Sequence, residues 1–540
     1  MRKNLLALFF YFSMVGLNAQ NTVYIYEPQI PILIERTDNI LKYIRVNSPK
    51  GGTLNTINLT FTDEVNLKEI QAVRAYYSGT EADQRKNEVH YAPVDYYISG
   101  SRKSGLAANP SYSILKSEQK NGKKEVAFTL NQPLFPGINY FWISIQMKKS
   151  ASLTSVITSK ISEITIDNTS AAFETKSADQ PRRLGIGVRY PGDDGAAAYR
   201  IPGLVTSNKG TLLAVYDVRY NSSVDLQEHI NIGLSRSVNG GKTWEKMRIP
   251  MSFGEYGGLP TGQNGVGDPA ILVDKQTGTI WIIAAWTHGM GNRRAWFNSL
   301  SGMDVEKTAQ LVISRSDDDG KTWSAPINIT SQVKDTAWRF LLQGPGRGIS
   351  MQDGTLVFAS QFIDPNALPH AGIIYSKDRG QTWKISVPAR DNTTEAQVAE
   401  VTPGVLMLNM RDNRGGSRAV STTSDMGKTW TEHPSNRGAL QEPVCMASLL
   451  NVEGKDNVLG KDILLFSNPN TTKDRKNITI KASLDGGITW LESHQLLLDE
   501  GYGWGYTCLT MIDRETVGIL YESSVAHMTF QAVKLKDIIR

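Results

Sequence analysis

Short runs in which apolar and polar residues alternate, separated by turn-forming residues, follow one another along the first third of the chain. Eight such runs lie between Val23 and Asn168, and each is rich in β-branched and aromatic residues. They read VYIY, IPILIE, LKYIRV, TINLTFT, VDYYIS, EVAFTL, YFWISIQM and SEITI. Long amphipathic helical periodicity is hard to find. The pattern predicts a compact β-sandwich over residues 20–175, closed by a polar linker from Thr169 to Pro181.

The rest of the chain contains an internal repeat. Five segments share the pattern Ser/Thr-x-Asp-x-Gly-x-Thr-Trp, in which Asn239 replaces the aspartate of the first copy. Because the tryptophans step by 79, 60, 47 and 60 residues, each repeat has room for about four short strands, the size of a propeller blade. The aspartate can hydrogen-bond turn backbone, the glycine permits a positive φ, and the tryptophan covers the hairpin. We therefore interpret Asp318, Asp378, Asp425 and Asp485 as turn residues.

The N-terminal residues 1–19 have the pattern of a cleaved signal peptide. A basic pair at positions 2 and 3 precedes an apolar run over residues 5–15 and small residues that end at Ala19. A transmembrane helix needs roughly 20 apolar residues, and glycine and polar residues interrupt this run from residue 16 onward. No other stretch approaches that length. We expect an exported protein of the periplasm or the cell exterior, without a transmembrane anchor.

Composition narrows the classes of function. The 540 residues suffice for two folded units, and the net charge of +5 is too weak for a nucleic-acid-binding surface. The two cysteines, Cys445 and Cys508, are too few for a disulfide scaffold, and the sequence leaves open whether they pair. The seven histidines show no HExxH or Cys/His spacing, and no glycine-rich phosphate loop follows a strand, so we expect no metal or cofactor.

The repeated turns resemble the Asp box (BNR repeat) of the sialidase, or neuraminidase, superfamily, and the likeness runs from about Arg183 to the C-terminus. Tyr-Arg-Ile-Pro at residues 199–202, just before the first box, resembles the opening motif of that family. The resemblance implies a six-bladed β-propeller over residues 181–540. It also implies a secreted exo-α-sialidase that removes terminal sialic acid from glycoproteins, glycolipids and oligosaccharides without a cofactor.

Sialic acid carries a carboxylate on its anomeric carbon, and arginine suits such a group because its guanidinium is a planar fork of donors. By resemblance, Arg200, Arg411 and Arg475 form a triad that binds this carboxylate. Glu522, in Leu-Tyr-Glu near the C-terminus, matches the acidic residue that holds the first arginine. A buried arginine needs a partner of this kind.

A second set of residues resembles the contacts to the sugar's 4-hydroxyl side. Arg219 and Asp268 match the family here, although Asp268 in Gly-Asp-Pro could equally be a turn residue before proline. Trp286 and Met290 suit either an N-acetyl pocket or the core.

Like-charge repulsion disfavours a carboxylate nucleophile at a carbon that already bears a carboxylate, whereas a neutral phenol avoids it. Sialidases with a tyrosine nucleophile are a known exception to the two-carboxylate rule of glycosidases. Gly-Tyr-Thr-Cys-Leu matches the family's nucleophile segment and implies Tyr506. A phenol needs a neighbouring base. Glu395 matches the family's base, and Glu400 is the alternative five residues on.

The acid/base should be a carboxyl on an open loop, and Asp225 lies where the family places it; Asp217 and Glu228 are alternatives. A non-catalytic glycan lectin, or a two-carboxylate glycosidase for neutral polysaccharides, would have no use for this whole set. The sequence leaves open the linkage preference and whether the products are those of hydrolysis, trans-sialylation or anhydro-sugar release. It also leaves open whether the N-terminal domain is a spacer or binds carbohydrate.

Overall fold

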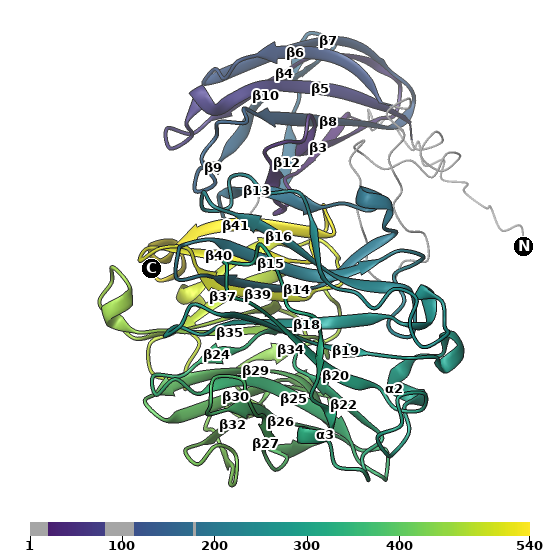
Figure 1. Cartoon of the computed structure of the whole chain (residues 1–540). Coiled ribbons are helices and arrows are strands. Elements are labelled where there is room, and N and C mark those ends of the chain that lie inside the picture. The colour runs from purple at the N-terminus through teal and green to yellow at the C-terminus, as the bar shows by residue number, and fades with distance from the viewer. Residues whose placement is uncertain (1–19, 81–112, 177–179) are drawn as a thin grey trace, which may run out of the picture.

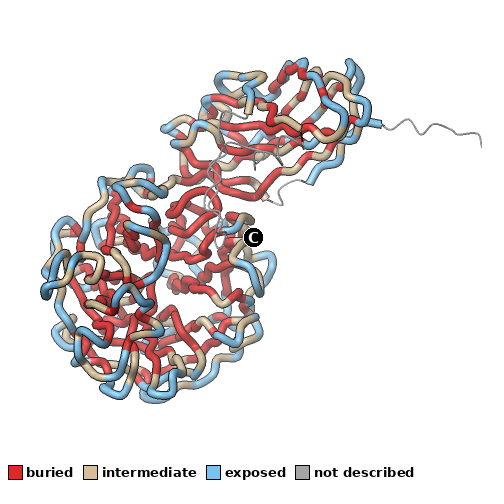
Figure 2. Tube along the Cα trace, turned by 90° about the vertical axis from the view of Figure 1, so that its right-hand side faces the viewer, coloured by how far each residue is buried: buried red, intermediate tan, exposed pale blue. Residues whose placement is uncertain are grey.

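The computed structural model describes residues 20–80, 113–176 and 180–540, and these residues are almost entirely β-structure. A smaller unit at the N-terminus lies on one side of a larger ring of sheets (Figure 1). Buried residues fill the interior of both units, and exposed residues gather at the turns (Figure 2). The expected leader, residues 1–19, and the expected strand VDYYIS lie outside the described residues.

The N-terminal unit consists of two facing sheets, as the alternating pattern predicts. Strand β7 shows the alternation most clearly, because its residues are exposed and buried in strict turn along its length. One sheet has the order β12 (Phe173–Lys176), β1 (Thr22–Tyr26), β3 (Asn39–Ser48), β8 (Gly137–Met147), β5 (Ile70–Thr80) and β6 (Ile114–Lys120). The other has the order β11 (Thr169–Ser170), β10 (Ser159–Ile166), β4 (Gly52–Phe61) and β7 (Glu125–Leu134).

Two details of the predicted sandwich are wrong. The expected polar linker from Thr169 begins instead as strands β11 and β12, which complete the edges of both sandwich sheets. The run IPILIE contributes only β2 (Ile32–Leu33), which pairs with β13 of the larger unit rather than with a sandwich strand. Strands β5 and β6 had no counterpart among the predicted runs.

The larger unit is the predicted six-bladed propeller. Within residues 180–540, six sheets of at least four strands follow one another around the ring, and β13 closes it by pairing with β41 near the C-terminus. The first two blades comprise β14 (Ala198–Thr206), β15 (Leu212–Arg219), β16 (Ile230–Ser237) and β17 (Arg248–Met251), then β18 (Val266–Val273), β19 (Ile280–Trp286), β20 (Gln310–Ser316), β21 (Ile327–Asn328) and β23 (Gly346–Arg347). The third comprises β22 (Phe340–Gln343), β24 (Ile349–Ser350), β25 (Leu356–Ile363), β26 (Pro369–Ser376), β27 (Lys384–Ile385) and β28 (Arg390–Asp391).

The remaining blades complete the ring. The fourth comprises β29 (Thr393–Thr402), β30 (Val405–Asp412), β32 (Ala419–Thr423) and β33 (Thr431–Glu432), with β31 (Gly416–Ser417) and β34 (Gln441–Glu442) forming a small ribbon beyond it. The fifth comprises β35 (Ser448–Val452), β36 (Ile463–Pro469), β37 (Ile478–Ser483) and β38 (Gln495–Asp499). The sixth comprises β39 (Thr507–Met511), β40 (Thr516–Tyr521), β41 (Met528–Lys534) and β13 (Arg182–Arg189). Short α-helices are α2 (Ala295–Asn298), α3 (Thr330–Val333) and α4 (Leu535–Ile538).

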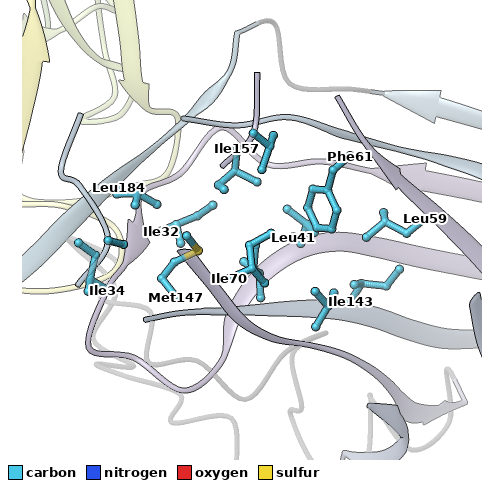
Figure 3. Close-up of a cluster of buried hydrophobic side chains, with 14 of the residues drawn as sticks. Ile32, Ile34, Leu41, Leu59, Phe61, Ile70, Ile143, Met147, Ile157 and Leu184 are labelled. Carbon is cyan, nitrogen blue, oxygen red and sulfur yellow. The ribbon is translucent and has the colours of Figure 1, made fainter. Parts of the chain in front are cut away.

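The two units share one continuous core. Strands β2 and β9 (Val156–Ile157) both pair with β13, so sandwich segments extend the sixth blade. Ile32 and Leu184 from this junction pack in the same buried cluster as Leu41 and Phe61 of the sandwich (Figure 3). Because burial of a large aliphatic side chain contributes about 1.5–3 kcal/mol, this junction stabilises both units together.

Three of the innermost strands are irregular near their first residues, where the functional site lies. Register shifts interrupt β14 after Arg200, β18 after Gly267 and β29 after Thr393. The backbone φ is positive at Ile201 (63°) and at Asp268 (58°), which is uncommon for residues other than glycine. Such bulges re-aim side chains, and here they do so at one mouth of the central channel.

Candidate active site

Tyr506 and Glu395 are hydrogen-bonded to each other at this mouth. Tyr506 immediately precedes β39, and its hydroxyl donates to the carboxylate oxygens of Glu395 on β29 at 2.6 and 2.7 Å. Arg411, at the end of β30, donates to Glu395 and, at 3.2 Å, to the Tyr506 hydroxyl oxygen. Burial, followed by the charge of Glu395, raises the pKa of Tyr506 well above its usual value. The phenol is therefore neutral and already hydrogen-bonded to a carboxylate that can accept its proton.

Glu522 connects the first arginine to the Tyr506 backbone. This fully buried carboxylate accepts from Arg200 Nε at 2.7 Å and from the Ile201 backbone N–H at 2.9 Å. Its other oxygen accepts from the backbone N–H of Tyr506 at 3.0 Å. One carboxylate thus holds both segments in register, which explains how the bulged β14 keeps its conformation.

The three predicted arginines converge on the Tyr506 ring. Arg200 lies 5.5 Å and Arg475 5.7 Å from its centroid, while Arg411 reaches its hydroxyl. Arg475 differs from the other two in its partners. It donates to the backbone carbonyls of Trp504 and Val444, each at 3.1 Å, and has no carboxylate partner among the described residues. The cluster can therefore bind an anion.

Arg219 pairs with two aspartates at this mouth, one buried and one exposed. Arg219 is fully buried and donates to Asp217 at 2.8 and 3.1 Å and to Asp225 at 2.7 Å. Asp225 lies on the loop after β15, and its side chain is 57% exposed, so a ligand can reach it. Burial tends to raise the pKa of Asp225, but the charges of Arg219 and Arg200 outweigh it and lower the pKa.

Asp268 behaves differently from these two carboxylates. Its backbone N–H donates to Asp217 at 2.8 Å, and its carbonyl accepts from the Gln343 amide. Burial, and then the charge of Asp217, raises the pKa of Asp268 well above its usual value. Asp268 thus has a left-handed backbone and a carboxyl that favours the neutral form, both unusual for a simple turn before proline.

A cavity of about 290 Å³ opens among these groups. Asp225, Asp268, Glu395, Arg411 and Tyr506 are polar residues that line it. Apolar side chains line it as well: Leu226, Ala295, Trp296, Phe340 and Leu342. The site can therefore take a small ligand that has a charged end and an apolar substituent.

Comparison with known proteins identifies the family. A family model described as the N-terminal domain of BNR-repeat neuraminidase matches residues 20–170, and one described as a BNR repeat-like domain matches residues 201–493. A sialidase from Bacteroides fragilis (strain YCH46) is 66% identical over 523 residues, which cover 97% of this chain and 96% of that protein. The chain belongs to the sialidase family. As a sialidase, the enzyme acts on sialylated glycans.

Two further sialidases are similar to this chain. The solved structure of Hadza microbial sialidase Hz136 superposes on this sialidase with a TM-score of 0.90 at 59% identity, covering 96% of this chain and all of that one. A sialidase of Paraclostridium sordellii is 30% identical over 371 residues, 65% of this chain and 88% of that protein. The first likeness thus covers nearly the whole chain, and the second about two thirds of it.

The carboxylates weighed as alternatives have other partners in this sialidase. Glu400 accepts from the backbone N–H groups of Gln352 and Gly404, away from Tyr506. Glu228 accepts from Asn221 on the surface. Asp217 is buried beneath Arg219 and cannot be reached from the cavity.

Two apolar candidates belong to the core. Trp286 stacks on Phe253 with ring centroids 4.3 Å apart, and Met290 packs in a buried cluster with Leu226. Sequence reasoning missed Phe340 and Leu342, which line the cavity in their place. Their strand, β22, contains no recognisable sequence motif. Only its position in the ring therefore shows that these two residues lie at the site.

The repeated turns of this sialidase are structural, as predicted. Asp318 accepts from Ser316, from the Lys321 backbone and from Thr322, all within its own turn. Asn239 makes the equivalent bonds in the first copy. Cys445 and Cys508 are both buried free thiols. In the described part of the chain, no helix is long and apolar enough to cross a membrane, and no cluster of three His, Cys, Asp or Glu could hold a metal ion.

Proposed function

We propose that this sialidase is an exported exo-α-sialidase that hydrolyses terminal sialic acid with retention, through a covalent intermediate on Tyr506. The hydrogen bond from the Tyr506 hydroxyl to Glu395, made beside three arginines, carries the proposal. Export is proposed from the leader-like pattern of residues 1–19.

In the proposed complex the arginine cluster binds the substrate carboxylate. Arg475, whose guanidinium has only carbonyl partners, supplies the uncompensated positive charge. The carboxylate then lies against the Tyr506 ring, and the anomeric carbon lies near the phenol oxygen. The apolar wall around Phe340 and Leu342 would receive an uncharged substituent of the sugar.

In the first step the Tyr506 oxygen bonds to the anomeric carbon, and the phenol proton passes to Glu395. The glycosidic bond breaks as Asp225 gives its proton to the leaving oxygen. In the second step water loses a proton to Asp225, its oxygen bonds to the anomeric carbon, and the bond to Tyr506 breaks. The proton on Glu395 returns to the phenol, so the enzyme is regenerated and the anomeric configuration is inverted twice.

This scheme requires a protonated Asp225, although the free site lowers its pKa. Bound substrate weakens one cause of that shift, since its carboxylate neutralises Arg200, and it strengthens the opposing effect of burial, since its glycan covers the exposed Asp225 side chain. Substrate binding therefore raises the pKa of Asp225 toward that of a general acid.

Covalent trapping tests the proposal. Incubation with a 2,3-difluorinated sialic acid should add one sugar to the protein, and peptide mass spectrometry should place it on Tyr506. NMR of early turnover of a sialoside should show α-sialic acid as the first product. First release of the β-anomer, or labelling of a carboxylate in place of Tyr506, would refute the mechanism. Sialoside binding without any turnover would favour the lectin alternative.

A further inference from the structure

A second cavity, of about 710 Å³, opens at the other mouth of the propeller channel. The innermost strands that begin at the active site end here. Strand β14 runs from Arg200 to Thr206, and β29 runs from Glu395 to Glu400, with the later residue of each pair lining this cavity. Its volume lies in the range of small-molecule binding sites, about 300–1,000 Å³.

Arg347 on β23 extends into this cavity without a counter-ion. Its Nη1 donates to the backbone carbonyl of Leu509 at 3.2 Å, and its buried Nε has no hydrogen-bond partner within the part of the chain that the structure describes. No carboxylate lies within ion-pair distance of Arg347 among the described residues. A desolvated cation without an opposite charge is costly, so the position favours an anionic ligand. Burial also lowers the pKa of Arg347, in accord with an uncompensated charge.

Ser350 on β24 is a second unsatisfied group on the same wall. This residue is only 8% exposed, it lines the same cavity, and its Oγ has no hydrogen-bond partner in residues 20–80, 113–176 and 180–540. Buried hydroxyls are nearly always hydrogen-bonded, so this one lacks an acceptor that a ligand could supply. Lys275 also lines the cavity and forms no ion pair with any described residue.

Two acidic residues that line this cavity are already engaged. Both oxygens of Glu400 accept from backbone N–H groups, those of Gln352 and Gly404. Glu453 pairs with Lys455 at 2.7 Å and accepts from the Gln352 side chain at 3.1 Å. Neither is an ion-pair partner of Arg347. Asp456, the third acidic residue that lines the cavity, forms no ion pair among the described residues, so the positive charge of Arg347 is available to a ligand.

The surroundings of Arg347 match those of Arg475 in one respect. Each guanidinium donates to backbone carbonyl oxygens and has no carboxylate partner among the described residues. We propose that Arg347 and Ser350 form a binding site for a small oxyanion at the mouth of the channel opposite the active site. The oxyanion is either a free inorganic one or the carboxylate of an acidic sugar, since the cavity accommodates both.

Calorimetric titration at constant ionic strength tests this site, with inorganic phosphate and free N-acetylneuraminate as separate probes. The background is Arg411→Ala, which weakens anion binding at the active site. We expect at least one probe to bind, and Arg347→Met added to this background to weaken it about 10- to 100-fold. Binding of phosphate alone assigns a free inorganic oxyanion, and binding of N-acetylneuraminate alone assigns an acidic sugar. Failure of both probes to bind would overturn the proposal.

Two further variants control for charge and folding. Arg514→Met removes the same charge from an exposed position and should leave the affinity unchanged. Ser350→Ala keeps the charge and should weaken binding severalfold, with unchanged sialidase activity in the otherwise wild-type protein. Equal affinities in the Arg347→Met and Arg514→Met variants would show that the probe binds elsewhere and would overturn the assignment.

Discussion

The repeated turns and the catalytic mouth use the same kinds of side chain in different ways. In the fifth copy, Asp485 accepts from Ser483 and Thr489, so all its partners lie within four residues of it. At the mouth, Glu522 binds Arg200, which is 322 positions away in the sequence. Because a turn is built from neighbours, it can recur five times, whereas the mouth forms once, where the blades meet. Carboxylates at the turns thus stabilise local structure, and those at the mouth are available for chemistry.

The largest effect that separates the two regions is expected from Tyr506→Phe. Loss of the hydroxyl removes the proposed nucleophile, so kcat should fall at least about 10³-fold on a 4-methylumbelliferyl sialoside. Stability should change little, because the ring and its packing remain. Turnover near that of the wild type would remove Tyr506 from the mechanism and make the mouth no more catalytic than the turns.

Asp225→Asn should give the next largest effect. Loss of the acid should lower kcat about 10²- to 10⁴-fold on sialyllactose, and less on the methylumbelliferyl substrate, whose leaving group needs little protonation. Glu228→Gln, on the same loop, is the matched control and should retain activity. An equal loss on both substrates would argue against Asp225 as the acid.

Asp499 is a buried carboxylate whose effect on stability should change with pH in the opposite direction to that of a turn aspartate. It is fully buried, accepts from Gly501 and Ser524, and burial raises its pKa to about 6. The folded state thus favours the protonated form, which contributes stability below about pH 4 that is lost as the pH rises through 6. The expected loss of unfolding free energy is on the order of 3 kcal/mol. In Asp499→Asn, urea denaturation should show no such fall; an unchanged slope between pH 4 and 6.5 would disprove the assignment.

Asp485 should show the opposite sign and the smallest effect. Burial opposes ionisation, but the hydrogen bonds of its turn lower its pKa to about 2. Its contribution is present above about pH 4 and is lost as the pH falls through 2. Asp485→Ala should cost about 1 kcal/mol of unfolding free energy at pH 7 with kcat/KM unchanged.

The chain supplies a matched control for this turn. Asp485→Asn should keep most of the stability but lose the acid dependence. In the first copy Asn239 accepts from Ser237 and from the Thr243 backbone N–H, and its amide donates to the Thr243 hydroxyl. A loss of activity in Asp485→Ala would instead link the turns to the catalytic mouth.

Much of the architecture could be predicted because it depends on neighbours in the sequence. The alternation along β7 and the repeated turns depend on residues two to seven positions apart in the sequence. The presence of five such turns predicted the propeller. The pairing of β2 with the sixth blade of the propeller was not predictable. A short apolar run fits a sandwich sheet and a propeller blade equally well. The same holds for Phe340 and Leu342, whose burial beside the site depends on the neighbouring blade.

The sequence by itself determined the β-rich pattern, the turns and the small set of residues able to carry the chemistry. Only the tertiary structure distinguished Glu395 from Glu400. The two lie on one strand, and five residues of extended chain span about 16 Å, so they reach opposite mouths of the channel. It likewise placed Arg347 on the second cavity and left both Arg347 and Arg475 without carboxylate partners among the described residues. Local hydrogen bonds are encoded between neighbours, but the site requires the closed ring to bring distant strands together.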